Sequence, residues 1–132
     1  LMNIQEMSTI KQYRLPVKIF ILNNHYMGMV RQWQELLHGN RLSESYMDSL
    51  PDFVKLAESF GATGFRIQKP GDVDSLIREM IKVKGPVICD VIVDPKENCF
   101  PMIPSGATHN QMLLGPEDKL EGDVSEEGMV LV

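Results

Sequence analysis

Residues 17–33 read Val-Lys-Ile-Phe-Ile-Leu-Asn-Asn-His-Tyr-Met-Gly-Met-Val-Arg-Gln-Trp, and this stretch decides the fold. An apolar run ends abruptly in two carboxamides, Asn23 and Asn24, and a helical pattern begins after Gly28. A buried strand that stops at polar residues and turns into a helix is typical of open α/β sheets, which bind ligands beyond the carboxyl ends of their strands. We therefore expect a ligand crevice at this turn.

Helical and strand-like patterns alternate on both sides of this stretch. Periodicity predicts helices over residues 3–15, 29–37, 51–60 and 73–83, and strands over 17–22, 63–68 and 87–93. Asn3 and Glu6 have the spacing of a capping box for the first helix. The apolar strand 17–22 is expected to be central and covered on both faces. The alternation predicts an α/β fold in three layers, a parallel sheet with helices on both faces.

Composition narrows the class of protein. The 132 residues suit one domain, and the formal charge of −5 resides entirely in residues 115–132, which leaves a neutral body. A neutral body with an acidic tail gives no reason to expect nucleic acid or a membrane as partner. Two cysteines, an expected buried Cys89 among them, and the lack of a signal peptide favour a reducing, cytoplasmic compartment.

The turn itself carries oxygen ligands of the kind that hard cations prefer. The carboxamide of Asn24 and an exposed backbone carbonyl at Tyr26 suit Mg²⁺, which commonly shares its ligands with a cofactor's phosphates. Gly28 would let the backbone approach such a phosphate closely. A plain turn after a strand is the alternative interpretation of the two asparagines. For Trp33 the alternative is a core position on an amphipathic helix.

Four stretches resemble one enzyme family. Leu22–Gln34 is similar to the second half of the thiamine diphosphate motif, in the version found in the large catalytic subunit of acetolactate synthases. Met2–Met7 resembles the helix after that family's Gly-Asp-Gly loop, and Pro51–Gly61 resembles its next helix. Phe100–Gly106 resembles its C-terminal tail. The resemblance covers residues 1–114 and implies the thiamine-diphosphate-binding fold, incomplete at its N-terminal side.

The resemblance implies a cofactor site at the turn. Asn24 would coordinate Mg²⁺ through its side chain and Tyr26 through its carbonyl, with the metal bridging the diphosphate of thiamine diphosphate. Met27 and Gly28 would line the diphosphate with backbone amides, and Met29 would also touch the cofactor. The family binds FAD as well, through a domain to which nothing in this chain corresponds.

The resemblance also implies a substrate site. Met29, Val30 and Trp33 would form the mouth of the active site, and Ser105 with Gly106 would lie in a tail segment lining the same pocket. The family condenses two pyruvates, or pyruvate and 2-ketobutyrate, with loss of CO₂, in branched-chain amino-acid biosynthesis. Its large subunits form homodimers or tetramers and bind a regulatory small subunit.

Two functional elements of the family have no counterpart in the sequence. These are the Gly-Asp-Gly loop with the second metal ligand and the glutamate that activates the thiamine ring, so no catalytic residue is assigned and the chain alone is expected to be inactive. We expect residues 1–114 to be the C-terminal part of a thiamine-diphosphate-binding domain, with 95–114 as a surface tail and 115–132 as a flexible acidic extension. The alternatives are another thiamine-dependent carboligase or oxidase, such as glyoxylate carboligase or pyruvate oxidase, and a non-catalytic truncated module.

Overall fold

The computed structural model describes residues 1–118, in which the chain forms two compact units. The first unit comprises Leu1–Asn24 and Ser49–Asp94, and the second comprises His25–Asp48 and the chain from Pro95 onward. The acidic extension expected over 115–132 lies outside the described residues from position 119. Within residues 1–118, no helix is long and apolar enough to cross a membrane.

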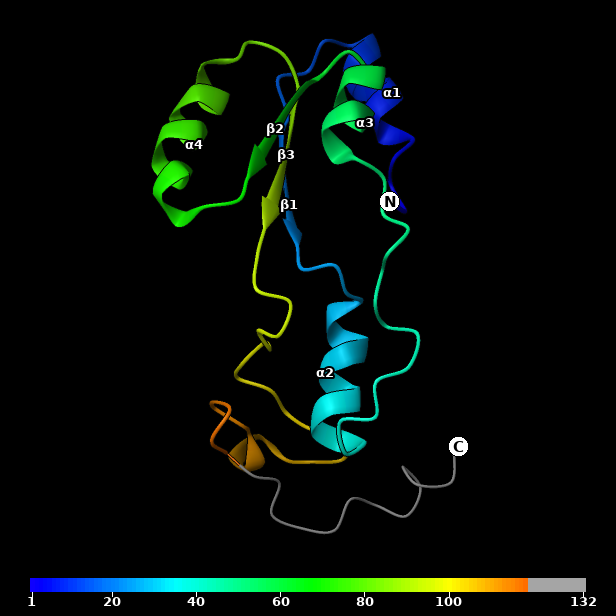
Figure 1. Ribbon diagram of the computed structural model, residues 1–132, viewed down its shortest axis with the longest axis vertical. Helices are drawn as coiled ribbons and strands as arrows, with labels where there is room; N and C mark the ends of the chain where they lie inside the picture. The colour runs from blue at the N-terminus through cyan, green and yellow to red at the C-terminus, as the bar shows by residue number, and fades with distance from the viewer. Residues whose placement is uncertain (119–132) are drawn as a thin grey trace. The chain divides into compact units, whose positions relative to one another are not determined.

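The first unit is a parallel three-stranded sheet with helices on both faces, as predicted (Figure 1). Its elements are α1 (Glu6–Gln12), β1 (Lys18–Asn23), α3 (Phe53–Ser59), β2 (Thr63–Ile67), the 3₁₀ turn η1 (Pro70–Asp72), α4 (Val73–Lys82) and β3 (Val87–Ile92). The strand order is β1-β3-β2, and both β1 and β2 run parallel to β3. The three carboxyl ends therefore share one edge of the sheet, where the sequence predicts a ligand.

Two apolar clusters hold the helices to the sheet. Helices α1 and α3 pack on one face of the sheet and α4 packs on the other (Figure 1). Ala57 and Ile88 are buried on the first face, and Met80 is buried on the second. The buried thiol of Cys89 on this second face confirms its predicted place in the core. Gly64 permits close packing of α3 on β2, because a Cβ there would lie 2.8 Å from the Cα of Val54.

Strand β1 is an edge strand in this chain, and the prediction that it is central was wrong. Strand β3 is central instead, and the side chains of Phe20 and Leu22 on β1 are 45% and 71% exposed. Hydropathy shows how much apolar surface a strand has to bury, but it does not say which elements of the chain cover it. Lys18, the exception in this apolar run, donates to the carbonyl oxygens of Val83 and Gly85 at 2.8 and 2.6 Å.

Several boundaries differ from the predicted ones. Helix α1 covers only part of 3–15, because Leu1–Gln5 form tighter turns, with the Glu6 amide donating to Asn3. The predicted capping box is absent, since Gln5 precedes the helix and its side chain makes no capping bond. Helix α3 begins two residues after Pro51, because Asp52 caps it and accepts from the amides of Val54 and Lys55.

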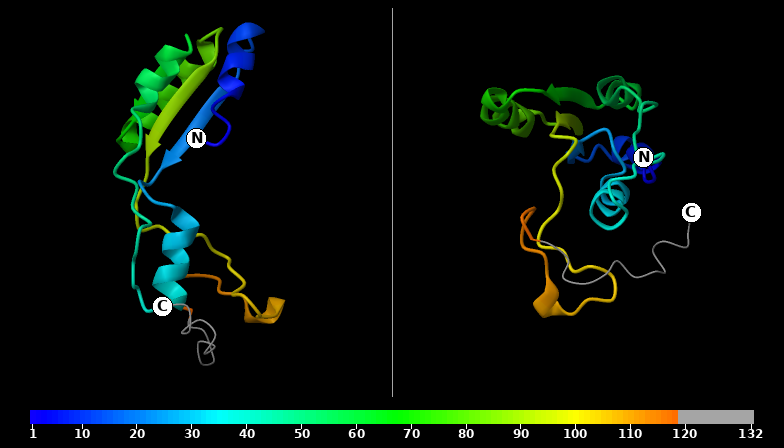
Figure 2. Two further views of the ribbon diagram at one scale, coloured as in Figure 1. Left: turned by 90° about the vertical axis from the view of Figure 1, so that its right-hand side faces the viewer. Right: turned by 60° about the horizontal axis from the view of Figure 1, so that its bottom comes forward.

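The second unit is built around α2 (Gly28–Leu37). Segment 38–48 leaves the helix through Gly39 and Asn40, both at positive φ, and runs back alongside it (Figure 2). The Gln34 side chain donates to the Ser43 carbonyl at 2.8 Å and thereby holds the returning segment against the helix. Residues 95–118 are irregular as expected, apart from the 3₁₀ turn η2 (His109–Gln111) and a bridge between Met102 and Leu113.

Candidate cofactor site

The two asparagines at the end of β1 differ in their surroundings. Asn23 is 6% exposed, and its Nδ2 donates to Oδ1 of Asp90 on β3 at 2.9 Å. Asn24 follows the last residue of β1 and is half-buried. Asn23 thus stabilises the sheet, and the ligand role of Asn24 stays a prediction.

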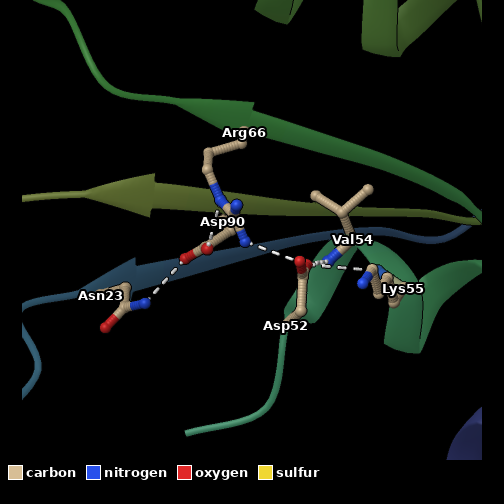
Figure 3. A network of polar contacts seen from close by, with 6 residues as sticks. All are labelled: Asn23, Asp52, Val54, Lys55, Arg66 and Asp90. Atoms are coloured by element: carbon tan, nitrogen blue, oxygen red, sulfur yellow. Dashed lines mark hydrogen bonds and ion pairs between the residues drawn. The ribbon is translucent and has the colours of Figure 1, made fainter. Parts of the chain in front are cut away.

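Asp90 is the centre of a polar network at this end of the sheet (Figure 3). Its buried carboxylate accepts from Asn23 on one side and from Nε of Arg66 on β2 at 3.0 Å on the other. The same guanidinium forms an ion pair with Asp52 at 3.0 Å, and Asp52 caps α3. The network therefore joins all three strands to the start of α3, and it lies one residue from Asn24.

Charge in this network is stabilised by local hydrogen bonds. The backbone amide of Lys55, followed by that of Val54 and by Arg66, lowers the pKa of Asp52. The hydrogen bond to Asp90 raises the pKa of Arg66, so this guanidinium stays charged. Burial, with a smaller contribution from the charge of Asp90, raises the pKa of the Cys89 thiol and makes it a poor nucleophile.

In the second unit, the turn after Asn24 pairs with segment 43–47. Tyr26 and Tyr46 face each other in an antiparallel bridge, with their rings in an edge contact at 5.2 Å between centroids. The bridge bonds run from the Met27 amide to Ser45 and from the Met47 amide to His25, each at 2.8 Å. Tyr26 and Tyr46 therefore form a non-hydrogen-bonded pair, in which the carbonyl of Tyr26 points away from segment 43–47. This direction suits the ligand role predicted for that oxygen.

Helix α2 begins directly after this turn at Gly28, one residue before the predicted start at Met29. Met27 is its N-cap, and no side chain caps the helix, so its first amides are not satisfied by a capping group. An uncapped helix start is a favourable place for an anion such as a diphosphate. The Met27 amide already donates to Ser45, so a phosphate contact from that amide would require the bond to open.

The apolar side of α2 is exposed. Met29, Val30 and Trp33, the predicted substrate residues, line an apolar hollow of about 480 Å³ together with Gln34 and His38. Trp33 is 43% exposed within this chain, so the alternative of a core position does not apply here. Ser105 is exposed but does not line this hollow, and the structure does not bring it together with Trp33.

The buried side of α2 is polar, which the sequence pattern did not predict. Arg31 and Gln32 are buried against the chain after Pro95. Asp90 and Arg66 were also missed, although a single carboxylate in the apolar run 87–93 is a signal that could have found Asp90. Such a charge needs a buried partner, and a neighbouring strand is the nearest place for one.

The oxygen atoms at the turn fit Mg²⁺ bound together with a diphosphate. A carboxamide and a backbone carbonyl are hard, neutral ligands, and Mg²⁺ takes its remaining ligands from phosphates and water. Residues 1–118 hold no cluster of three His, Cys, Asp or Glu side chains that could bind a metal ion without such help.

Comparisons with known proteins give the family of the chain. Residues 1–91 match the family described as thiamine pyrophosphate enzyme, C-terminal TPP binding domain. The acetolactate synthase large subunit of Haemophilus influenzae is 47% identical over 114 residues, which cover 86% of this chain and 20% of that protein. The isozyme 3 large subunit of Escherichia coli is 44% identical over 121 residues, covering 89% of this chain and 21% of that protein.

A solved structure extends the likeness to the fold. The thiamine diphosphate-dependent 4-hydroxybenzoylformate decarboxylase of Rhodococcus jostii RHA1 aligns with a TM-score of 0.62 at 26% identity, over 69% of this chain and 17% of that one. The chain thus spans about a fifth of the length of the curated relatives it matches. On the match over most of its residues, the chain belongs to the thiamine pyrophosphate enzymes, within whose C-terminal TPP-binding domain it falls.

Proposed function

We propose that the chain forms part of an acetolactate synthase large subunit, which condenses two pyruvates, or pyruvate and 2-ketobutyrate, with loss of CO₂. The observation that carries this proposal is the turn between β1 and α2, where a carbonyl turned away from its partner segment precedes an uncapped helix start. The identity of 41–48% to acetolactate synthase large subunits favours this reaction over glyoxylate carboligase and pyruvate oxidase.

The cofactor contacts follow from the chain's own atoms. Asn24 and Tyr26, two residues apart in the sequence, would supply a carboxamide oxygen and a carbonyl oxygen to Mg²⁺. Gly28 would present its amide to the diphosphate, with Met27 and Met29 beside it. Thiamine diphosphate, when bound, supplies the electron sink for decarboxylation, and the chain supplies position and electrostatics.

The substrate contacts are proposed on the apolar hollow beside α2. Met29, Val30 and Trp33 would bury the alkyl group of the second 2-ketoacid, and Ser105 would approach from the tail. Because one additional methylene is worth about 1–3 kcal/mol in an apolar pocket, such a surface can favour 2-ketobutyrate over pyruvate.

The remaining proposals concern the whole protein. We place residues 1–114 in its thiamine-diphosphate-binding domain and residues 115–132 in an acidic extension. FAD would bind outside this chain, the large subunits would form a dimer or tetramer with a regulatory small subunit, and the compartment would be the cytoplasm. Neither nucleic acid nor a membrane is proposed as a partner.

A titration followed by NMR tests the cofactor site even at weak affinity. Thiamine diphosphate added to the ¹⁵N-labelled chain should shift the amide signals of Gly28 and Met29 only when Mg²⁺ is present. Asn24→Ala should remove this Mg²⁺ dependence, whereas Asn3→Ala, an exposed asparagine of the first unit, should not. Signals at the turn that do not respond to millimolar cofactor and Mg²⁺ would contradict the proposal. Pyruvate given to this polypeptide alone should yield no acetolactate.

A further inference from the structure

Gln32 is the most deeply buried polar side chain of α2, with 1% exposure. Its Nε2 donates to the carbonyl oxygen of Cys99 at 3.0 Å and lies 2.9 Å from Sδ of Met102. Its Oε1 accepts from the backbone amide of Cys99 at 2.7 Å. One carboxamide thus satisfies both backbone groups of a residue that is distant in sequence, and both ends of the carboxamide are used.

Neighbouring side chains of α2 bind the same stretch. Nη1 of Arg31 approaches the Lys96 carbonyl and the Asn98 side chain at 3.5 and 3.4 Å, and it pairs with Glu35 at 2.8 Å. Asn98 in turn donates to Glu35 at 3.1 Å. Because a buried carboxamide that loses its partners destabilises the fold, α2 and segment 96–102 stabilise each other.

Segment 96–102 leads into a loop that is closed at its base. Met102 and Leu113 are both buried, and each donates its amide to the other's carbonyl at 2.8 Å, which closes loop 103–112 between them. Gln32 contacts this base through the Met102 sulfur. The loop carries Ser105, while the residue after Gln32 is Trp33, on the apolar side of the helix.

We propose that Gln32 is a positioning residue, which docks the base of loop 103–112 on α2. On the proposed function, it thereby sets where Ser105 stands relative to Trp33 and tunes the choice of the second 2-ketoacid. Gln32 touches neither substrate nor cofactor in this arrangement, because its carboxamide lies on the side of α2 away from the apolar hollow. It acts only by holding Cys99 and Met102, and thereby the loop that follows them, in place.

Amide hydrogen exchange tests the docking directly in the chain. Gln32→Met keeps the length of the side chain and removes the bonds to Cys99, so exchange at the Cys99 amide should become about tenfold faster. Gln34→Met is the matched control on the same helix, because Gln34 bonds Ser43, and it should leave Cys99 exchange unchanged. Unchanged Cys99 protection in Gln32→Met would overturn the proposal.

A second variant covers the case in which Gln32→Met does not fold. Gln32→Glu retains the shape, but its carboxylate places an oxygen against the Cys99 carbonyl oxygen, where the Gln32 amide donates, and this repulsion should undock the segment until the carboxyl group is protonated. Protection of the Cys99 amide should therefore be low near neutral pH and return in mild acid, a pH dependence that loss of packing would not produce. Protection that does not change with pH would contradict the hydrogen-bonding role.

The product ratio of the holoenzyme tests the consequence for specificity. With pyruvate and 2-ketobutyrate supplied together, Gln32→Met should change the ratio of 2-aceto-2-hydroxybutyrate to 2-acetolactate by about tenfold, with a smaller change in kcat. An unchanged ratio despite faster Cys99 exchange would refute the role in specificity. A wild-type holoenzyme that forms neither product would refute the proposed function and, with it, the role of Gln32 in specificity. The exchange data would still decide whether Gln32 docks the base of the loop on α2.

Discussion

Replacing Asp90 by Asn is the sharpest test of the network behind the asparagine pair. Asp90 accepts two hydrogen bonds, from the Asn23 carboxamide at 2.9 Å and from the Arg66 guanidinium at 3.0 Å. Asparagine has nearly the same shape, but one of its two terminal atoms is a donor. With the Asn23 carboxamide oriented as it is, the new amide keeps one bond and places a donor against a donor at the other, whichever way it turns.

The expected loss follows from these two contacts. A hydrogen bond to a charged group contributes about 1.5–3 kcal/mol. Arg66 is partly exposed and can turn toward water, which reduces the penalty on its side. We expect Asp90→Asn to lower the free energy of unfolding by about 2 kcal/mol, which corresponds to a shift of about 1 M in the urea midpoint.

Far-UV circular dichroism in urea is the suitable measurement, because the single tryptophan, Trp33, belongs to the second unit and the sheet to the first. Asp48→Asn, the same change at an exposed site, should leave the midpoint unchanged. A double-mutant cycle with Arg66→Met should give a coupling free energy of about 1 kcal/mol. Additive losses, or a loss below about 0.5 kcal/mol for Asp90→Asn, would refute the reasoning.

Three further predictions concern packing, thiol reactivity and pH. Gly64→Ala should lower the free energy of unfolding by about 1–3 kcal/mol in urea denaturation, because its Cβ would overlap α3, whereas Gly71→Ala, with nothing within 4 Å, should cost little. A thiol reagent should modify the exposed Cys99 rapidly and the buried Cys89 only on unfolding; equal rates would contradict the fold. The pKa of Asp52 is lowered in the folded state, so its negative charge stabilises the fold at pH values above the ordinary pKa of 3.8. Asp52→Asn should therefore lower the urea midpoint near neutral pH. The difference in urea midpoint between the two proteins should vanish as the pH falls below 3.8.

The local patterns predicted the elements well, because each element depends on the spacing of its own apolar residues. The three- to four-residue spacing of apolar residues in α4 and the apolar run of β3 were both readable from sequence, and both elements lie where they were predicted. The order of the strands was not readable. Strands β1 and β3 are equally apolar runs, and only their neighbours in space distinguish the edge strand from the central one.

The direction of α2 shows a second limit of the sequence. Its apolar residues, Trp33 among them, predict a buried side, yet in the described residues that side is exposed and Gln32 is buried instead. A carboxamide can be buried wherever backbone groups are available to satisfy it, and the backbone at Cys99 is a partner that no helical period reveals. Long-range polar pairing therefore accounts for the part of the site that periodicity missed.

On the proposed function, one of the two asparagines joins the sheet and the other serves a ligand. Asn23 is the last residue of β1 and faces Asp90, whereas Asn24 follows the strand and is the proposed ligand. Asn23 takes the first task through Asp90, whose second bond to Arg66 extends the restraint to β2 and, through Asp52, to α3. The backbone that enters Asn24 is thus fixed from three strands. A candidate ligand placed directly after such a restraint loses little conformational freedom on binding, because the network has already ordered the chain that carries it.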